Sequence, residues 1–78
     1  MATAKRSTEI AKRTQIQEAK ATRDELEEAL AGAGVLLPSL GLDALSLASD
    51  YLPPLVDLGR CNPDTARKLA AALREITR

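Results

Sequence analysis

Apolar positions recur with helical spacing in two parts of the chain. In the first part they follow one another at steps of three and four residues, which predicts a helix over residues 22–32. The side chains of this apolar stripe are Ala19, Leu26, Ala29, Leu30 and Ala33. Gly32 and Gly34 then supply the left-handed backbone on which many helices end.

Two short patterns fit the start of this helix. Thr14-x-x-Gln17 and Thr22-x-x-Glu25 each place a hydroxyl three residues before an amide or a carboxylate, which is the capping-box arrangement. Residues 1–13 precede both starts and hold little apolar material. We therefore expect them to form a basic N-terminal arm that is either disordered or a solvated extension of the helix. Residues 14–78 are expected to form a single helical domain.

The second periodic part lies at the C-terminal end. Asn62, Pro63 and Asp64 place an N-cap side chain, a first-turn proline and an acid in the order that helix starts favour. A helix over residues 63–77 is predicted. Its apolar positions, again at steps of three and four residues, are Ala66, Leu69, Ala70, Leu73 and Ile76.

The segment between the two helices, residues 35–59, holds eleven Leu and Val residues and is the main core material. Pro38, Ser39 and Gly41 mark a turn, after which a short helix is expected. Its apolar face would be formed by Leu42, Leu45, Leu47 and Leu52, with Ser49 among them. Pro53 and Pro54 end that helix. Residues 55–58 form either one more helical turn or a short extended piece, and the helical turn is the preferred expectation.

Composition supports helices throughout. Ala supplies 14 and Leu 13 of the 78 residues, Ile and Val together supply only five, and Tyr51 is the only aromatic residue. These proportions favour helix over strand. We therefore predict an all-α fold, namely a small bundle of three to four helices with a long N-terminal helix and a capped C-terminal helix.

Leucines of the middle segment are the candidate partner-binding residues. A domain of this size buries only about 60% of the surface of its unfolded chain, so these leucines either fill the core or partly face a partner or a second copy. The sequence leaves both interpretations open. The candidates are Leu36, Leu37, Leu40, Leu42, Leu47, Leu52 and Leu55.

Charge is divided into three blocks. Residues 1–23 carry a net charge of +4, residues 24–59 carry seven acids and no Lys or Arg, and residues 60–78 carry +3, which together give zero. The basic ends can pair with the acidic middle of the same chain or of another copy. A homo-oligomer or another protein partner is therefore expected.

Several classes of chemistry lack the residues they need. The chain has no His, and Cys61 is its only cysteine, so we expect no enzyme activity, no metal site, no cofactor and no small-molecule substrate. Cys61 is predicted to be a buried packing residue at the corner before the last helix. The N-terminus has no apolar signal region and no stretch is long and apolar enough to span a bilayer. A cytoplasmic location without membrane contact is expected.

Basic residues near the C-terminus suggest an alternative partner. Their positions predict a cationic helix face that could contact the phosphates of duplex DNA, whereas the lack of aromatic residues removes the stacking surface that single strands need. The candidate phosphate-binding residues are Arg60, Arg67, Lys68, Arg74 and Arg78.

One stretch carries a family resemblance. Residues 59–70, GRCNPDTARKLA, resemble the stretch that follows the recognition helix in lambda-repressor-like helix-turn-helix domains. The resemblance covers twelve residues, and the two preceding helices of that family have no counterpart here. More diffusely, LPSLGLD, LVDLGRCN and KLA are similar to segments of short uncharacterised helical proteins of high-GC bacteria, which implies a bacterial origin. The predicted function is a non-catalytic protein–protein interaction or self-assembly module; the alternative is a small dimeric DNA-binding transcriptional regulator.

Overall fold

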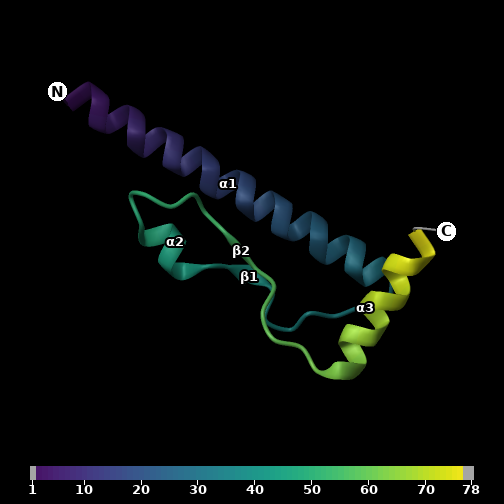
Figure 1. Ribbon diagram of the computed structural model, residues 1–78. Helices are drawn as coiled ribbons and strands as arrows, with labels where there is room; N and C mark the ends of the chain where they lie inside the picture. Colours follow the sequence, from purple (N-terminus) through teal and green to yellow (C-terminus); the bar gives the residue numbers. More distant parts are fainter. Residues whose placement is uncertain (1, 77–78) are drawn as a thin grey trace.

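The computed structural model describes the backbone of residues 2–76 and the side chains of residues 10–76 (Figure 1). Its elements are α1 (Ala2–Gly32), β1 (Gly41–Leu42), α2 (Ala44–Ala48), β2 (Val56–Asp57) and α3 (Pro63–Ile76). Helix α1 forms one long side of the molecule, the β1–α2–β2 segment runs beside it, and α3 lies across its C-terminal end (Figure 1). The shape is elongated, with extents of 53 × 23 × 17 Å.

Helix α1 is continuous from Ala2 and includes residues 2–13, which the sequence left open between a disordered arm and a helical extension. The two predicted helix starts are therefore wrong. Thr14 Oγ1 donates to the carbonyl of Ile10 at 3.1 Å, and Thr22 Oγ1 donates to that of Glu18 at 2.9 Å. Each hydroxyl donates a hydrogen bond to a carbonyl of the preceding turn, as threonine does inside a helix, so neither threonine caps a helix N-terminus. The predicted end is confirmed, because the last helical residue is Gly32 and Gly34 has a φ of +75°.

A two-stranded antiparallel sheet makes the all-α prediction wrong. Leu42 of β1 pairs with Val56 of β2, and the hydrogen bond from the amide of Asp43 to the carbonyl of Leu55, at 2.8 Å, extends the ladder by one residue. The preferred helical turn over residues 55–58 is wrong for the same reason. Pro53 and Pro54 disfavour helix on their N-terminal side, and the residues after them find hydrogen-bond partners in β1.

The core lies where the C-terminal end of α1 meets the linker to β1. Leu30, Val35 and Leu37 are its buried hydrophobic residues, and three partly buried leucines, Leu26, Leu40 and Leu69, pack against it. Leu69 is the α3 residue in this cluster. So small a core in a chain of this length contributes modest stability, and contacts outside it must hold the β1–α2–β2 segment in place.

Helix α3 begins as predicted and ends at Ile76, the last described residue. Asn62 Oδ1 accepts a hydrogen bond from the amide of Thr65 at 2.8 Å, so Asn62 is the N-cap. Gly59, just before this start, has a φ of +73°, and a Cβ there would overlap the side chain of Ser39. Both the backbone conformation and the close approach of the two chain segments require glycine at this position.

Candidate functional site

Ser46 is the centre of the hydrogen bonds that hold the β1–α2–β2 segment. Its side chain is fully buried, with 0% exposure. Its Oγ donates to the carbonyl of Asp43 at 2.8 Å and accepts from the amide of Leu55 at 2.9 Å. Asp43 caps α2 by accepting from the amide of Ser46 at 2.9 Å. One hydroxyl therefore ties the start of α2 to the chain that enters β2.

Lys12 joins this segment to α1. Its Nζ donates to the carbonyl of Ser46 at 2.9 Å and to that of Leu52 at 2.7 Å. The loop between them is shaped by Ser49, whose Oγ accepts from the amides of Tyr51 and Leu52, both at 3.0 Å. The lysine thus positions the loop that presents Tyr51, whose side chain is 96% exposed.

The leucines predicted to bind a partner occupy three different environments. Leu37 belongs to the buried core. Leu40, Leu42 and Leu47 are half-buried, and Leu40 packs against the core. The exposed members of the predicted set are Leu36, Leu52 and Leu55, and Leu36 is the most exposed of them at 72%.

Other apolar side chains are also exposed, although the sequence pattern assigned them to the apolar faces of helices. Leu45 was assigned to the apolar face of the short helix, yet its side chain is 79% exposed while the neighbouring Ser46 is buried. On α3, Leu73 is 54% and Ile76 is 80% exposed, although both lie on the predicted apolar stripe. Their spacing predicted an apolar face correctly and could not say whether the chain itself covers it.

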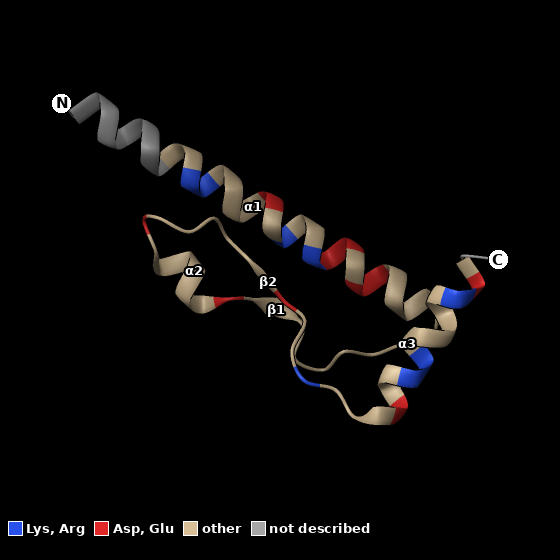
Figure 2. Ribbon diagram, viewed as in Figure 1, with Lys and Arg blue, Asp and Glu red and all other residues tan. Residues whose placement is uncertain are grey.

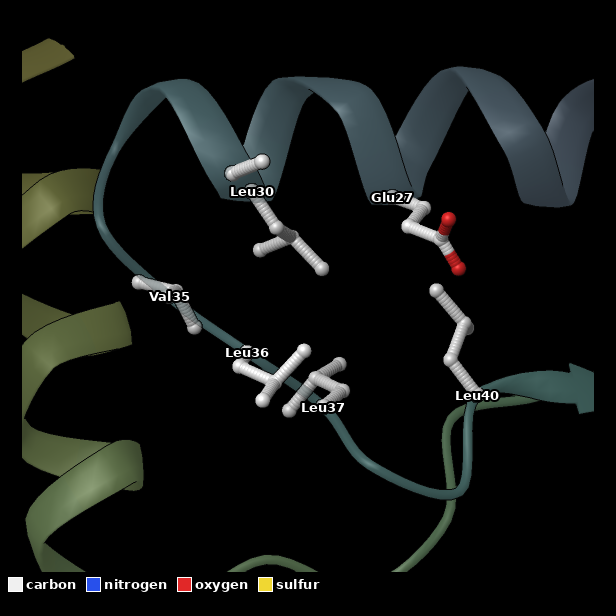
Figure 3. A pocket seen from close by; sticks show the side chains of 7 residues that line it. Glu27, Leu30, Val35, Leu36, Leu37 and Leu40 are labelled. Atoms are coloured by element: carbon white, nitrogen blue, oxygen red, sulfur yellow. The ribbon is translucent and has the colours of Figure 1, made fainter.

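A pocket lies between the last turns of α1 and the linker to β1, and we call it the linker pocket (Figure 3). It has a volume of about 280 Å³. Glu27 lies on its α1 side, with its carboxylate close to Leu40, and Leu36 extends from the linker (Figure 3). The pocket is lined by Glu27, Leu30, Ala31, Val35, Leu36, Leu37 and Leu40. Apart from Glu27 its wall is apolar, so an aliphatic side chain is the occupant it suits.

Two further hollows follow α1 on the side of the Pro53–Pro54 loop. One, of about 330 Å³, is bordered by Lys12 and Tyr51, and the other, of about 310 Å³, by Thr22 and Val56. Gln15 and Pro53 border both hollows. Both are more open than the linker pocket, and they separate α1 from the loop that Lys12 holds.

Charges are segregated along the molecule (Figure 2). Four exposed acids on the C-terminal half of α1 form what we call the acidic ridge: Asp24, Glu25, Glu27 and Glu28. Arg23 forms ion pairs with Asp24 and, at 3.3 Å, with Glu27. On α3, Arg67 pairs with Asp64 of its own helix at 3.6 Å.

The predicted phosphate-binding residues are exposed where the structure describes them. Arg60 lies on the chain leading to α3, and Arg67, Lys68 and Arg74 lie on α3 itself. Arg78 lies outside the described residues. The acidic ridge occupies the same end of the molecule as this cationic helix (Figure 2), so a phosphate backbone approaching α3 would also approach carboxylates.

Cys61 is exposed, so the prediction that it packs in a buried corner is wrong. Residues 58–62, between β2 and α3, are all exposed. Within residues 10–76, no three His, Cys, Asp or Glu side chains gather closely enough to hold a metal ion. None of the described helices combines the length and the apolar character that crossing a membrane requires.

Comparison with known proteins adds no relative. The resemblance of residues 59–70 to helix-turn-helix domains therefore stays an expectation from the sequence. No protein-family model, curated protein or solved structure matches this chain.

Proposed function

We propose that this chain is a non-catalytic protein–protein interaction module that associates through its exposed apolar side chains. The observation that carries the proposal is that more of the large apolar side chains are exposed than are buried in the core. Among residues 10–76, three large apolar side chains are buried in the core, whereas nine are exposed by 47% or more. Single exposed leucines are ordinary, whereas exposed apolar groups that gather into a patch mark surfaces that bind other proteins.

The accessible surface supports the same conclusion. It measures 6442 Å², whereas a compact monomer of 8.3 kDa is expected to expose about 4,600 Å². The radius of gyration is 16.2 Å, against about 12 Å for a compact domain of this length. A standard interface buries about 800 Å² on each partner, which is less than half of the surplus of about 1,900 Å².

A small DNA-binding regulator is the second candidate, and the exposure of Arg60, Arg67 and Lys68 favours it. Against it stands the acidic ridge at the same end of the molecule. Repulsion between these carboxylates and the phosphates would offset part of the attraction that α3 supplies. The interaction module therefore remains the first proposal.

Two measurements test the proposal. Static light scattering of the full chain should give a molar mass that rises above 8.3 kDa with concentration, and Leu36→Asp should lower that mass at equal concentration, because a charge replaces an exposed apolar group. If Leu36→Asp associates as strongly as the parent chain, the exposed apolar surface at Leu36 does not take part in the association.

Fluorescence anisotropy with a labelled DNA duplex tests the alternative. We expect weak binding that the double reversal Arg67→Glu with Arg74→Glu changes no more than the double reversal Arg13→Glu with Lys20→Glu, which changes the net charge by the same amount on α1. Tight binding that falls steeply with salt, with a log–log slope of about −0.9 for each phosphate contact, and that only the α3 reversal abolishes would establish the regulator instead.

A further inference from the structure

The last turn of α3 presents apolar side chains that the described part of the chain leaves half or more exposed. Leu69 packs against the core, whereas Leu73 and Ile76, one and two turns further along, are 54% and 80% exposed. A half-covered amphipathic helix of this kind is complete only when a second apolar surface covers the rest of its face.

The linker pocket lies beside the part of the core that α3 contacts. Leu30, Val35 and Leu37 of its wall are also the core residues against which Leu69 packs. No residue of α3 lines the pocket, so α3 of the same chain leaves it open. Helix α3 and the linker that borders the pocket lie at the same end of the molecule (Figure 1). Each molecule therefore carries, at that end, exposed apolar side chains on α3 and an open apolar pocket.

Charge favours a second copy of this chain as the source of the occupant. The acidic ridge borders the pocket through Glu27. Arg23 pairs with Glu27 and with Asp24, so this one cation faces two of the four carboxylates of the ridge. Lys68 of α3 is exposed and lies about 80° around the helix from Ile76, whereas Arg67 lies on the opposite face and pairs with Asp64. An α3 helix from another copy would thus bring the positive charge of Lys68 toward the acidic border.

We infer that the linker pocket of one copy receives Leu73 and Ile76 from α3 of a second copy, in a reciprocal pair in which each copy both inserts its helix turn and accepts that of the other. The inference rests on the proposed interaction function and names its partner. Because the turn and the pocket lie at one end of the molecule, a single two-fold axis can satisfy both contacts and close the assembly as a dimer.

Sedimentation velocity of mixed variants tests the reciprocal arrangement. Ile76→Asp removes the inserted group and keeps the pocket, whereas Leu36→Asp damages the pocket and keeps the inserted group. Both side chains are largely exposed, so far-UV circular dichroism should show a folded chain for each variant. Leu45→Asp, with a leucine that is also exposed and lies on α2, is the matched control.

We expect the parent chain and Leu45→Asp to dimerise alike, and each of the two disrupting variants to weaken dimerisation by about 30-fold or more. An equimolar mixture of Ile76→Asp and Leu36→Asp should then form a heterodimer more strongly than either variant pairs with itself, because the mixture restores one of the two contacts. Failure of the mixture to pair, or loss of the dimer in Leu45→Asp alone, would overturn the assignment of the surface.

The control outcomes separate this inference from the function on which it rests. A parent chain that stays monomeric at every concentration overturns the second copy as partner and leaves binding of a different protein intact. A parent dimer that neither Ile76→Asp nor Leu36→Asp weakens overturns the pocket assignment and leaves self-association intact.

Discussion

Replacing Ser46 with alanine should destabilise the β1–α2–β2 segment more than any other change of a single hydroxyl to hydrogen. The hydroxyl is fully buried and makes two hydrogen bonds, donating to the carbonyl of Asp43 and accepting from the amide of Leu55. Alanine can replace neither bond. It leaves the Leu55 amide without its protein partner in a partly buried position.

The magnitude follows from these two bonds. A typical hydrogen bond contributes about 1 kcal/mol net, so Ser46→Ala should lower the free energy of unfolding by about 2 kcal/mol. A domain of 78 residues has a total stability of about 4–12 kcal/mol, and the small core places this chain toward the lower end. The loss should lower the melting temperature by about 8–16 °C.

Urea unfolding followed by circular dichroism measures the loss, and hydrogen exchange locates it. The Leu55 amide should exchange faster in Ser46→Ala. Ser49→Ala is the control, since Ser49 Oγ also accepts two backbone amides but is partly exposed, so that water can replace it and the cost stays below about 1 kcal/mol. If Ser46→Ala were no less stable than Ser49→Ala, or if protection at Leu55 were unchanged, the role assigned to the buried hydroxyl would be refuted.

Three further substitutions test other parts of the fold. Gly59→Ala should destabilise the chain by about 2 kcal/mol or more in thermal unfolding, because the backbone has positive φ and the new Cβ meets Ser39; a stability equal to that of the parent would contradict the close approach. Asn62→Ala should cost about 1 kcal/mol and increase exchange at the Thr65 amide, since the cap is lost; unchanged exchange would argue against the cap. Cys61→Ser should change the unfolding free energy by less than about 0.5 kcal/mol, because the side chain is exposed, and a larger loss would restore the buried position that the sequence suggested.

The C-terminal helix could be predicted from the sequence because its signals are local. Asn62 and Pro63 act within one turn, and the periodic apolar positions need no knowledge of distant residues. The end of α1 was equally accessible, since Gly34 takes the left-handed conformation that its residue type favours. The start of α1 was not, because threonine serves equally well as a cap or as a helix-interior residue that bonds back to the preceding turn.

The two-stranded sheet could not be predicted because nothing local encodes it. Each strand has two residues, too few for an alternating pattern, and the pairing of Leu42 with Val56 depends on closure of the loop between them. Ser46 makes that closure possible through its bond to the amide of Leu55. The available signal was Asp43, an N-cap residue three positions before a serine, which predicts a helix start at residue 44 but says nothing of a contact nine residues later.

The candidate surface was only partly predictable for a similar reason. Leu36 and Leu37 are identical in type, yet one is 72% exposed and the other is buried, because neighbouring side chains on a non-helical linker point to different sides. Leu45 and Ser46 invert the usual rule, since the buried position is the polar one. Composition alone could identify an excess of leucine but could not say which leucines the fold would leave uncovered.

Methyl-resolved NMR of the full chain at increasing concentration tests the central claim most directly, because it reports on single side chains without a substitution. If the chain pairs with a second copy through the linker pocket, the methyl signals of Leu36, Leu73 and Ile76 should shift together as concentration rises from about 10 µM to about 1 mM, while those of Leu45 stay constant. Unchanged signals at all four residues, or shifts confined to Leu45, would contradict the account.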